Sequence, residues 1–143
     1  MFIGTSYPKL DDKFRLILPA KFRDRLAGGV ILTKGQEHCV NIMPSAEYLA
    51  KAAAITEGMV VGTPNRRNLS RHFFGMASEQ VPDGQGRILI APELREWAEL
   101  GKDLVVAGVG RHVEIWNPKI FAELMAAGAQ DFANYTDGEV NLN

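Results

Sequence analysis

LDDKFRLILP, at residues 10–19, and VPDGQGRILIAP, at residues 81–92, carry the same pattern of turn, strand and proline. Asp11 and Asp83 are 72 positions apart, and so are Arg15 and Arg87. Self-similarity at a fixed period marks a repeated structural unit. With only two such units, the sequence predicts a pseudo-twofold domain rather than a solenoid.

Length and composition are those of one globular domain. The 143 residues are 46% hydrophobic and 23% charged, and no apolar run reaches the roughly 18 residues of a membrane span. The start of the chain lacks a charged segment followed by an apolar stretch, so no secretory signal is expected. Cys39 is the single cysteine and has no partner for an intrachain disulfide, which favours a reducing cytoplasm.

Positive charge is local, because the net charge of the whole chain is only −1. Any nucleic-acid binding must therefore come from a patch. The first repeat is rich in cations, a basic stretch separates the repeats, and the end of the chain is acidic. The residues concerned are Lys9, Lys13, Arg15, Lys21, Arg23 and Arg25, then Arg66, Arg67 and Arg71, then Asp131, Asp137 and Glu139.

The same order of elements is predicted in both units: strand, turn, strand, helix, strand, strand, helix. Pro19 and Pro92 are expected in the first turn of a helix, where a missing N–H costs nothing. Thr63 and Pro64 predict a further helix through Arg71. Strands are expected at 5–10, 15–18, 30–32 and 40–43, and at 77–81, 87–90, 104–106 and 113–116. Neither short sheet would bury both faces alone, so the two are expected to close into one barrel.

The repeated turn combines an aspartate with an arginine four residues later. The aspartate is expected to accept hydrogen bonds from the backbone N–H groups that follow it. The arginine would then either pair with that aspartate or point outward. Lys13 beside Arg15 places two cations in one turn, which suits phosphates and guanine edges. Gln85 replaces Lys13 in the second turn, so the two copies should not contribute equally.

These two motifs, with the basic segment between them, resemble the MraZ family, whose members are tandem modules related to the AbrB-like swapped-hairpin fold. The resemblance runs from Met1 to about Phe132. It implies an α+β fold in which two AbrB-like repeats close into one pseudo-twofold β-barrel with flanking helices. The implied parts are a first module at 1–62, a linking basic helix at 63–76, a second module at 77–130 and a flexible acidic tail at 131–143.

The resemblance also implies a function. Such a protein would be a sequence-specific transcriptional regulator, a repressor, of the bacterial division and cell-wall gene cluster. It would bind short direct repeats in double-stranded promoter DNA upstream of its own operon, as a ring-shaped homo-oligomer in the cytoplasm and nucleoid. The implied DNA-contacting residues are Lys13, Arg15 and Arg87, with Lys9 and Gln85 beside them, and the implied structural residues are Asp11, Asp83, Gly86, Pro19 and Pro92.

Phe14 is a departure from the family pattern, which usually has glycine between the lysine and the arginine of the first motif. Gly86 keeps the glycine in the second motif. Glycine permits a positive φ or a close backbone approach. Phe14 therefore predicts an altered first loop, and its ring would be free to stack on a partner.

Other classes of function are less well supported by the residues. A hydrolase using the Asp11 and Asp83 pair lacks the Asp-Ser/Thr-Gly sequence of such dyads, and neighbouring cations oppose a raised carboxyl pKa. His38, His112 and Cys39 lack close metal-ligand spacing. No catalysis, cofactor, metal, membrane contact or small-molecule substrate is therefore expected. An antitoxin-like AbrB-fold module that binds a partner protein is the main alternative, although the tail is short for a toxin-binding arm.

Overall fold

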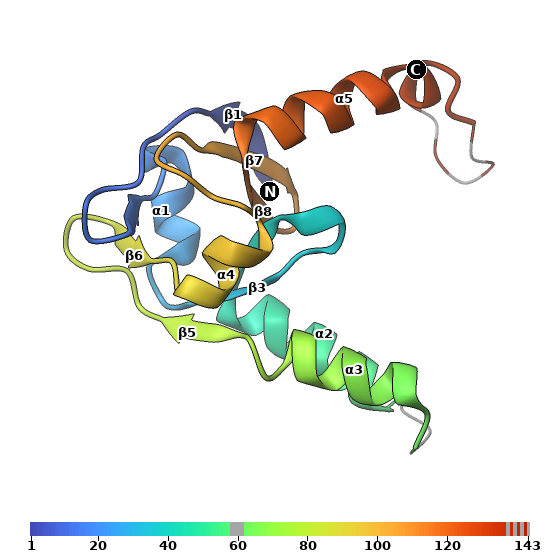
Figure 1. The fold of residues 1–143 in the computed structure, drawn as a ribbon, viewed down its shortest axis with the longest axis horizontal. Helices are drawn as coiled ribbons and strands as arrows, with labels where there is room; N and C mark the ends of the chain where they lie inside the picture. Colours follow the sequence, from blue (N-terminus) through green and yellow to red (C-terminus); the bar gives the residue numbers. More distant parts are fainter. Residues whose placement is uncertain (58–61, 137, 139, 141, 143) are drawn as a thin grey trace.

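The computed structural model describes residues 1–57, 62–136, 138, 140 and 142. Strands and helices alternate along the chain in mixed α+β order (Figure 1). The strands are β1 (Phe2–Ser6), β2 (Arg15–Ile17), β3 (Val30–Lys34), β4 (Val40–Pro44), β5 (Ser78–Gln80), β6 (Arg87–Leu89), β7 (Val105–Gly110) and β8 (Val113–Trp116). The helices are α1 (Ala20–Leu26), α2 (Ser45–Glu57), α3 (Pro64–Phe73), α4 (Pro92–Trp97) and α5 (Pro118–Ala133), with a short 3-10 turn at Gln36–His38.

Six strands form one antiparallel sheet in the order β1-β7-β8-β4-β3-β5. The hairpins β3–β4 and β7–β8 lie at its centre, and β4 pairs with β8 to join the two halves of the chain. β1 and β5 are the edges. β1 begins earlier than predicted, at Phe2, and it also ends earlier, because Pro8 has no N–H to donate. Instead, the Pro8 carbonyl accepts from Leu104 N (3.0 Å), and Leu10 N donates to the Lys102 carbonyl (2.8 Å).

The remaining two strands make a separate antiparallel ribbon, β2–β6. Each strand comes from a different half of the chain, so the ribbon ties the halves together. Two flanking bonds extend it: Leu18 N donates to the Gly86 carbonyl (2.8 Å), and Ile90 N donates to the Phe14 carbonyl (3.0 Å). The expected single closed barrel is therefore wrong. The six-stranded sheet stays open at β1 and β5, and β2 and β6 satisfy each other outside it.

The main core lies between the sheet, the ribbon and the helices α1 and α4. Its ribbon residues are Leu16 and Ile88, and the short helices contribute Phe22, Leu26 and Leu94. Each such side chain stabilises the fold by about 2 kcal/mol relative to an exposed one. Pro92 opens α4, as predicted, whereas Pro19 lies one residue before α1, at its N-cap. The core therefore depends on ribbon strands and helices from both halves.

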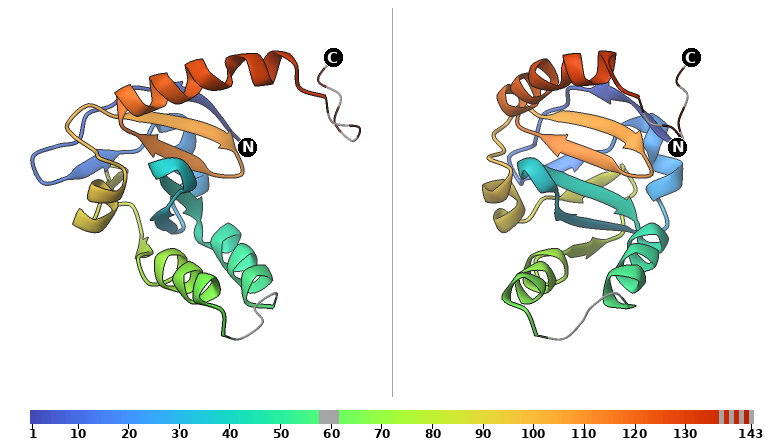
Figure 2. Two further views of the ribbon diagram at one scale, coloured as in Figure 1. Left: turned by 45° about the vertical axis from the view of Figure 1, so that its right-hand side comes forward. Right: turned by 90° about the vertical axis from the view of Figure 1, so that its right-hand side faces the viewer.

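Two smaller clusters attach the remaining helices. The rings of Tyr48 and Phe73 stack at 5.4 Å and join α2 to α3, and Figure 2 shows both helices on the same end of the molecule. α5 packs on Trp116 through Ile120, Phe121 and Leu124. No helix among the described residues is long and apolar enough to span a membrane.

The start of α3 follows the predicted capping signal, and α5 begins at a cap that was not predicted. The Thr63 hydroxyl accepts from Arg66 N at the start of α3, and the Asn117 side chain accepts from Lys119 N and Ile120 N at the start of α5. α5 runs to Ala133 and so includes Asp131, where the acidic tail was expected to begin. Asp137 and Glu139 of that tail, and residues 58–61 of the expected first module, lie outside the described residues.

Gly108 offers a test of the sheet edge. It pairs with Gly4 in β1, and a Cβ there would lie 2.5 Å from the Phe2 carbonyl carbon and 2.6 Å from Ile3 N. Because both atoms are backbone, Gly108→Ala should push β1 away and lower the free energy of unfolding by about 2 kcal/mol. Chemical denaturation measures this. Gly101→Ala is the control, because a Cβ there meets nothing within 4 Å, and equal stabilities would contradict the β1–β7 pairing.

Candidate nucleic-acid interface

The first repeated turn is closed by Asp11. Its Oδ1 accepts from the backbone N–H groups of Lys13 (2.8 Å) and Arg15 (2.9 Å). Its Oδ2 accepts from Arg15 Nε at 2.8 Å, so the same carboxylate also holds the guanidinium. The main chain completes the turn with a bond from Phe14 N to the Asp11 carbonyl (3.0 Å). We call this arrangement the aspartate clasp.

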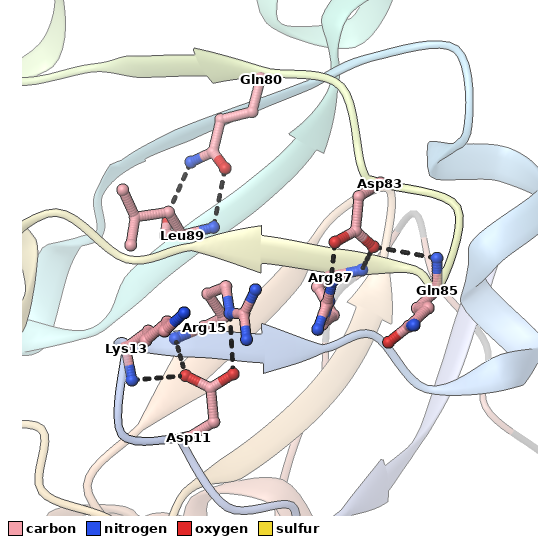
Figure 3. A network of polar contacts seen from close by, with 8 residues as sticks. All are labelled: Asp11, Lys13, Arg15, Gln80, Asp83, Gln85, Arg87 and Leu89. Carbon is pink, nitrogen blue, oxygen red and sulfur yellow. Dashed lines mark hydrogen bonds and ion pairs between the residues drawn. The ribbon is translucent and has the colours of Figure 1, made fainter.

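The second turn repeats the aspartate clasp bond for bond. Asp83 Oδ1 accepts from the N–H groups of Gln85 and Arg87, both at 2.9 Å, and Oδ2 accepts from Arg87 Nε at 2.7 Å. Gly86 N donates to the Asp83 carbonyl at 2.9 Å. Figure 3 shows the two clasps on neighbouring antiparallel strands, one at each end of the β2–β6 ribbon.

Both clasp carboxylates are held in the charged form. The N–H of Arg15 lowers the pKa of Asp11 below its ordinary value of 3.8, and the Arg15 side chain and the N–H of Lys13 lower it further. The N–H of Arg87 does the same to the pKa of Asp83, with the Arg87 side chain next. A group with a lowered pKa is a poor proton donor at neutral pH. The two carboxylates, each bound to its own turn, therefore do not form an acid–base dyad.

The clasps leave much of each guanidinium available. An arginine side chain has five N–H donors, and the aspartate takes only the one on Nε. The terminal nitrogens of Arg15 and Arg87 donate no hydrogen bond to any residue that the structure describes. The side chains are 31% and 26% exposed. Each clasp thus fixes its arginine at one edge and leaves the other donors without a hydrogen-bond partner among the described residues.

Phe14 and Gly86 adopt the same backbone conformation. Phe14 has φ +61° and Gly86 has φ +75°, both in the left-handed region. The expectation that the first loop has an altered geometry is therefore wrong. The clasp holds the Phe14 backbone in the left-handed conformation that glycine adopts in the second turn. The Arg95 guanidinium lies 3.5 Å from the centre of the Phe14 ring, which leaves the ring 45% exposed.

Arg23 and Arg95 brace the turns from α1 and α4. Arg23 Nε donates to the Leu18 carbonyl (2.9 Å), and Arg95 Nε donates to the Ile90 carbonyl (3.1 Å). Arg23 also fills the space above Gly86, where a Cβ would lie 2.8 Å from its Nε. Each helix arginine thus contacts the turn of the other half. Arg23 and Arg95 are 72 positions apart, the same spacing that relates the two aspartates and the two turn arginines.

The other predicted interface residues lie beside the turns. Lys13 and Gln85 are exposed at equivalent places, and no described residue forms an ion pair with Lys13. Lys9 forms an ion pair with Asp103 at 3.2 Å, and both side chains are largely exposed. Asp103 partly neutralises the charge of Lys9. We therefore expect Lys13, which has no such ion pair among the described residues, to attract an anion more strongly than Lys9 does.

Gln80, at the end of the edge strand β5, contacts the ribbon in a way that the sequence pattern did not reveal. Its carboxamide donates to the Leu89 carbonyl (2.6 Å) and accepts from Leu89 N (2.8 Å), as Figure 3 shows. The Gln80 side chain therefore satisfies the backbone N–H and carbonyl of Leu89 on the edge of β6 that faces away from β2. The repeat gave no signal for this role, because the position 72 residues earlier is Pro8, which has no such side chain.

The basic stretch between the repeats lies elsewhere. α3 packs on α2 at the end of the molecule seen in Figure 2, and Arg67 donates to the Gly62 carbonyl at 2.7 Å. Arg71 donates to Asn68 within the helix. These cations belong to a different surface from the two clasps.

The histidines and Cys39 have structural partners. His38 stacks on Trp97 at 4.1 Å, and His112 lies 3.6 Å from Glu114. Burial raises the pKa of the Cys39 thiol to about 12, which suits a packed side chain rather than a nucleophile. Within the described ranges, no group of three or more His, Cys, Asp or Glu residues is placed to hold a metal ion.

Comparisons with known proteins agree with the repeated turns. A family model described as "MraZ protein, putative antitoxin-like" matches residues 1–62 and 73–141. The chain is 46% identical over 138 residues to the transcriptional regulator MraZ of Salinispora arenicola, covering 96% of each chain. It is 47% identical over 133 residues to that of Saccharopolyspora erythraea, covering 93% of this chain and 92% of the relative. These names denote transcriptional regulators and indicate no catalytic family.

Phe14 allows a test of the left-handed turn. Phe14→Ala and Phe14→Gly both remove the contact with Arg95, but only glycine removes the Cβ strain of a positive φ. We expect Phe14→Gly to be about 1 kcal/mol more stable than Phe14→Ala, although glycine is ordinarily the more flexible residue. Thermal denaturation of the two variants measures the difference. A more stable alanine variant would show that the first turn does not adopt this conformation.

Proposed function

The chain belongs to the MraZ family, and we propose that it is a sequence-specific DNA-binding transcriptional regulator whose β2–β6 ribbon contacts the promoter. The observation that carries the proposal is the pair of aspartate clasps. They hold Arg15 and Arg87 on one ribbon with several N–H donors free. Guanine presents two acceptors, N7 and O6, in the major groove, and arginine is their commonest partner.

The ribbon has a suitable shape for this role. The major groove of B-form DNA admits a two-stranded β-ribbon. Side chains alternate between the two faces of a strand, so Arg15 and Arg87 share the face opposite the buried Leu16 and Ile88. Lys13, at the edge of the ribbon, is placed to contact a phosphate. Gln85 occupies that place in the second turn without a charge, and Lys9 adds a weaker, ion-paired cation.

One chain alone would bind weakly. Its net charge is −1, and two or three cations per chain release few counterions. A ring of chains would present the ribbon repeatedly to evenly spaced direct repeats and gain affinity by effective concentration. Apolar side chains exposed on the projecting helices supply candidate contacts between chains: Leu49 on α2, and Met125 and Phe132 on α5.

The family membership supports the remaining parts of the proposal. We place the protein in the cytoplasm at the nucleoid, repressing the division and cell-wall gene cluster from repeats upstream of its own operon. The two halves are proposed as AbrB-like modules, since both follow the order strand, strand, helix, strand, strand, helix. The proposed activity needs promoter DNA and further copies of the chain as partners, with no cofactor, membrane or small-molecule substrate.

An antitoxin-like role is the second candidate, because the family description contains that term. Such a role would require a segment that wraps a partner protein. α5 extends away from the body in Figure 1 and ends at Ala133. The unused N–H donors of Arg15 and Arg87 on one ribbon favour the regulator.

Removing the clasp arginines tests the regulator directly. Arg15→Ala and Arg87→Ala should each weaken promoter binding by about 1–3 kcal/mol and reduce the preference over random DNA. Fluorescence anisotropy at several salt concentrations measures both effects. Arg111→Ala, in the exposed turn between β7 and β8, is the matched control. Promoter affinity that survives both clasp substitutions would show that the ribbon is not the DNA-binding surface.

Assembly has its own test. Leu49→Glu, or Met125→Glu with Phe132→Glu, should lower the mass in solution and weaken binding to the repeat array at least about tenfold. Binding to a single repeat should change little, because each ribbon remains intact. Light scattering gives the mass and anisotropy the affinity. A monomeric variant that binds the array undiminished would rule out a functional need for the ring.

A further inference from the structure

The outward face of the ribbon carries two aliphatic side chains as well as two arginines. Ile17 is 51% exposed and Leu89 is 50% exposed, whereas the inward residues Leu16 and Ile88 are 0% and 2% exposed. Strands of a stable domain usually alternate apolar-in with polar-out. Here two of the four outward positions are apolar, and neither Ile17 nor Leu89 belongs to a hydrophobic cluster of the described residues.

The strand register places each aliphatic side chain opposite an arginine. Arg15 pairs with Leu89, and Ile17 pairs with Arg87. Residues directly opposite in an antiparallel pair have Cβ atoms about 5 Å apart. The face is therefore built from two similar units, each an arginine beside an aliphatic residue, arranged around the central Leu16–Ile88 pair.

This face is held in one conformation. The clasps fix the backbone at the start of both strands. Gln80 binds both main-chain groups of Leu89, so the edge of β6 has no free groups at that position. The four outward side chains therefore project from a prearranged surface, which lowers the entropic cost of binding.

The charge of the neighbouring arginines indicates what kind of partner covers Ile17 and Leu89. The flanking guanidinium groups retain free N–H donors, which match a polyanion rich in acceptors. A second copy of the same face would bring like charges together, because a twofold contact uses the same patch on both subunits. In the major groove, the thymine C5-methyl is the apolar group that lies among the acceptors of neighbouring bases.

We propose that Ile17 and Leu89 contact thymine C5-methyl groups next to the guanines bound by Arg87 and Arg15. Each half of the ribbon then selects a guanine with an adjacent thymine, rather than a guanine alone. The inference rests on the proposed function and deepens it, because it assigns the recognised base chemistry to two residues outside the repeated charged motif.

Deoxyuridine tests the inference, because it differs from thymidine only in lacking the methyl group. Footprinting first identifies the sequence upstream of the gene that the protein protects. The probe is a duplex of this sequence in which deoxyuridine replaces the thymidines beside the protected guanines. Wild-type binding should weaken about fourfold for each methyl group removed. Ile17→Ala should abolish the loss of affinity caused by deoxyuridine beside the guanine that Arg87 binds. Leu89→Ala should abolish the loss caused by deoxyuridine beside the guanine that Arg15 binds.

Val109→Ala is the control, since Val109 is a comparably exposed aliphatic residue on β7 and should leave the deoxyuridine response intact. Circular dichroism and light scattering check that each variant keeps its fold and mass. Equal wild-type affinity for thymidine and deoxyuridine probes would overturn the inference and leave the proposed function standing. A changed mass of Ile17→Ala or Leu89→Ala would assign the face to subunit contact instead. No promoter binding at all would overturn the proposed function, and the inference with it.

Discussion

Backbone pairing between β2 and β6 determines where the other parts of the candidate site lie. Each strand has three residues, too few for an independent hairpin, and each finds its partner in the other half of the chain. That pairing buries Leu16 and Ile88 against α1 and α4. It also brings the two aspartate clasps onto one ribbon, so the same contact that joins the halves assembles the candidate DNA-binding face.

Much of this arrangement was predictable, because it depends on local chemistry. The Asp-to-Arg spacing specified both turns, the prolines marked the starts of α1 and α4, and Thr63 capped α3. The expected barrel closure was wrong, because whether a sheet closes depends on how edges distant in the sequence pair. The expectation for Phe14 failed for a similar reason: propensity favours glycine at a positive φ, but the Asp11 clasp and the Arg95 contact hold phenylalanine there. The ion pair between Lys9 and Asp103 joins positions too distant in sequence to foresee.

The aspartates have a positive role in the proposed binding to a polyanion, although they are acidic. Each carboxylate cancels one charge, which would weaken a purely electrostatic contact. At the same time it fixes the backbone of the turn and the plane of the guanidinium, and this geometry favours base recognition over phosphate attraction. The clasp hydrogen bonds lower the pKa values of Asp11 and Asp83, so both carboxylates stay charged, as acceptors, from neutral pH into the acid range. They also explain why a hydrolase mechanism built on these carboxylates has no support in the structure.

Hydrogen exchange with and without promoter DNA would locate the binding surface on the intact protein. We expect slower exchange in residues 11–18 and 83–90 when the promoter duplex is bound, and little change in the β7–β8 hairpin. Protection confined to α2, α3 or α5, with unchanged exchange at both clasps, would contradict the assignment of the ribbon as the DNA-binding surface.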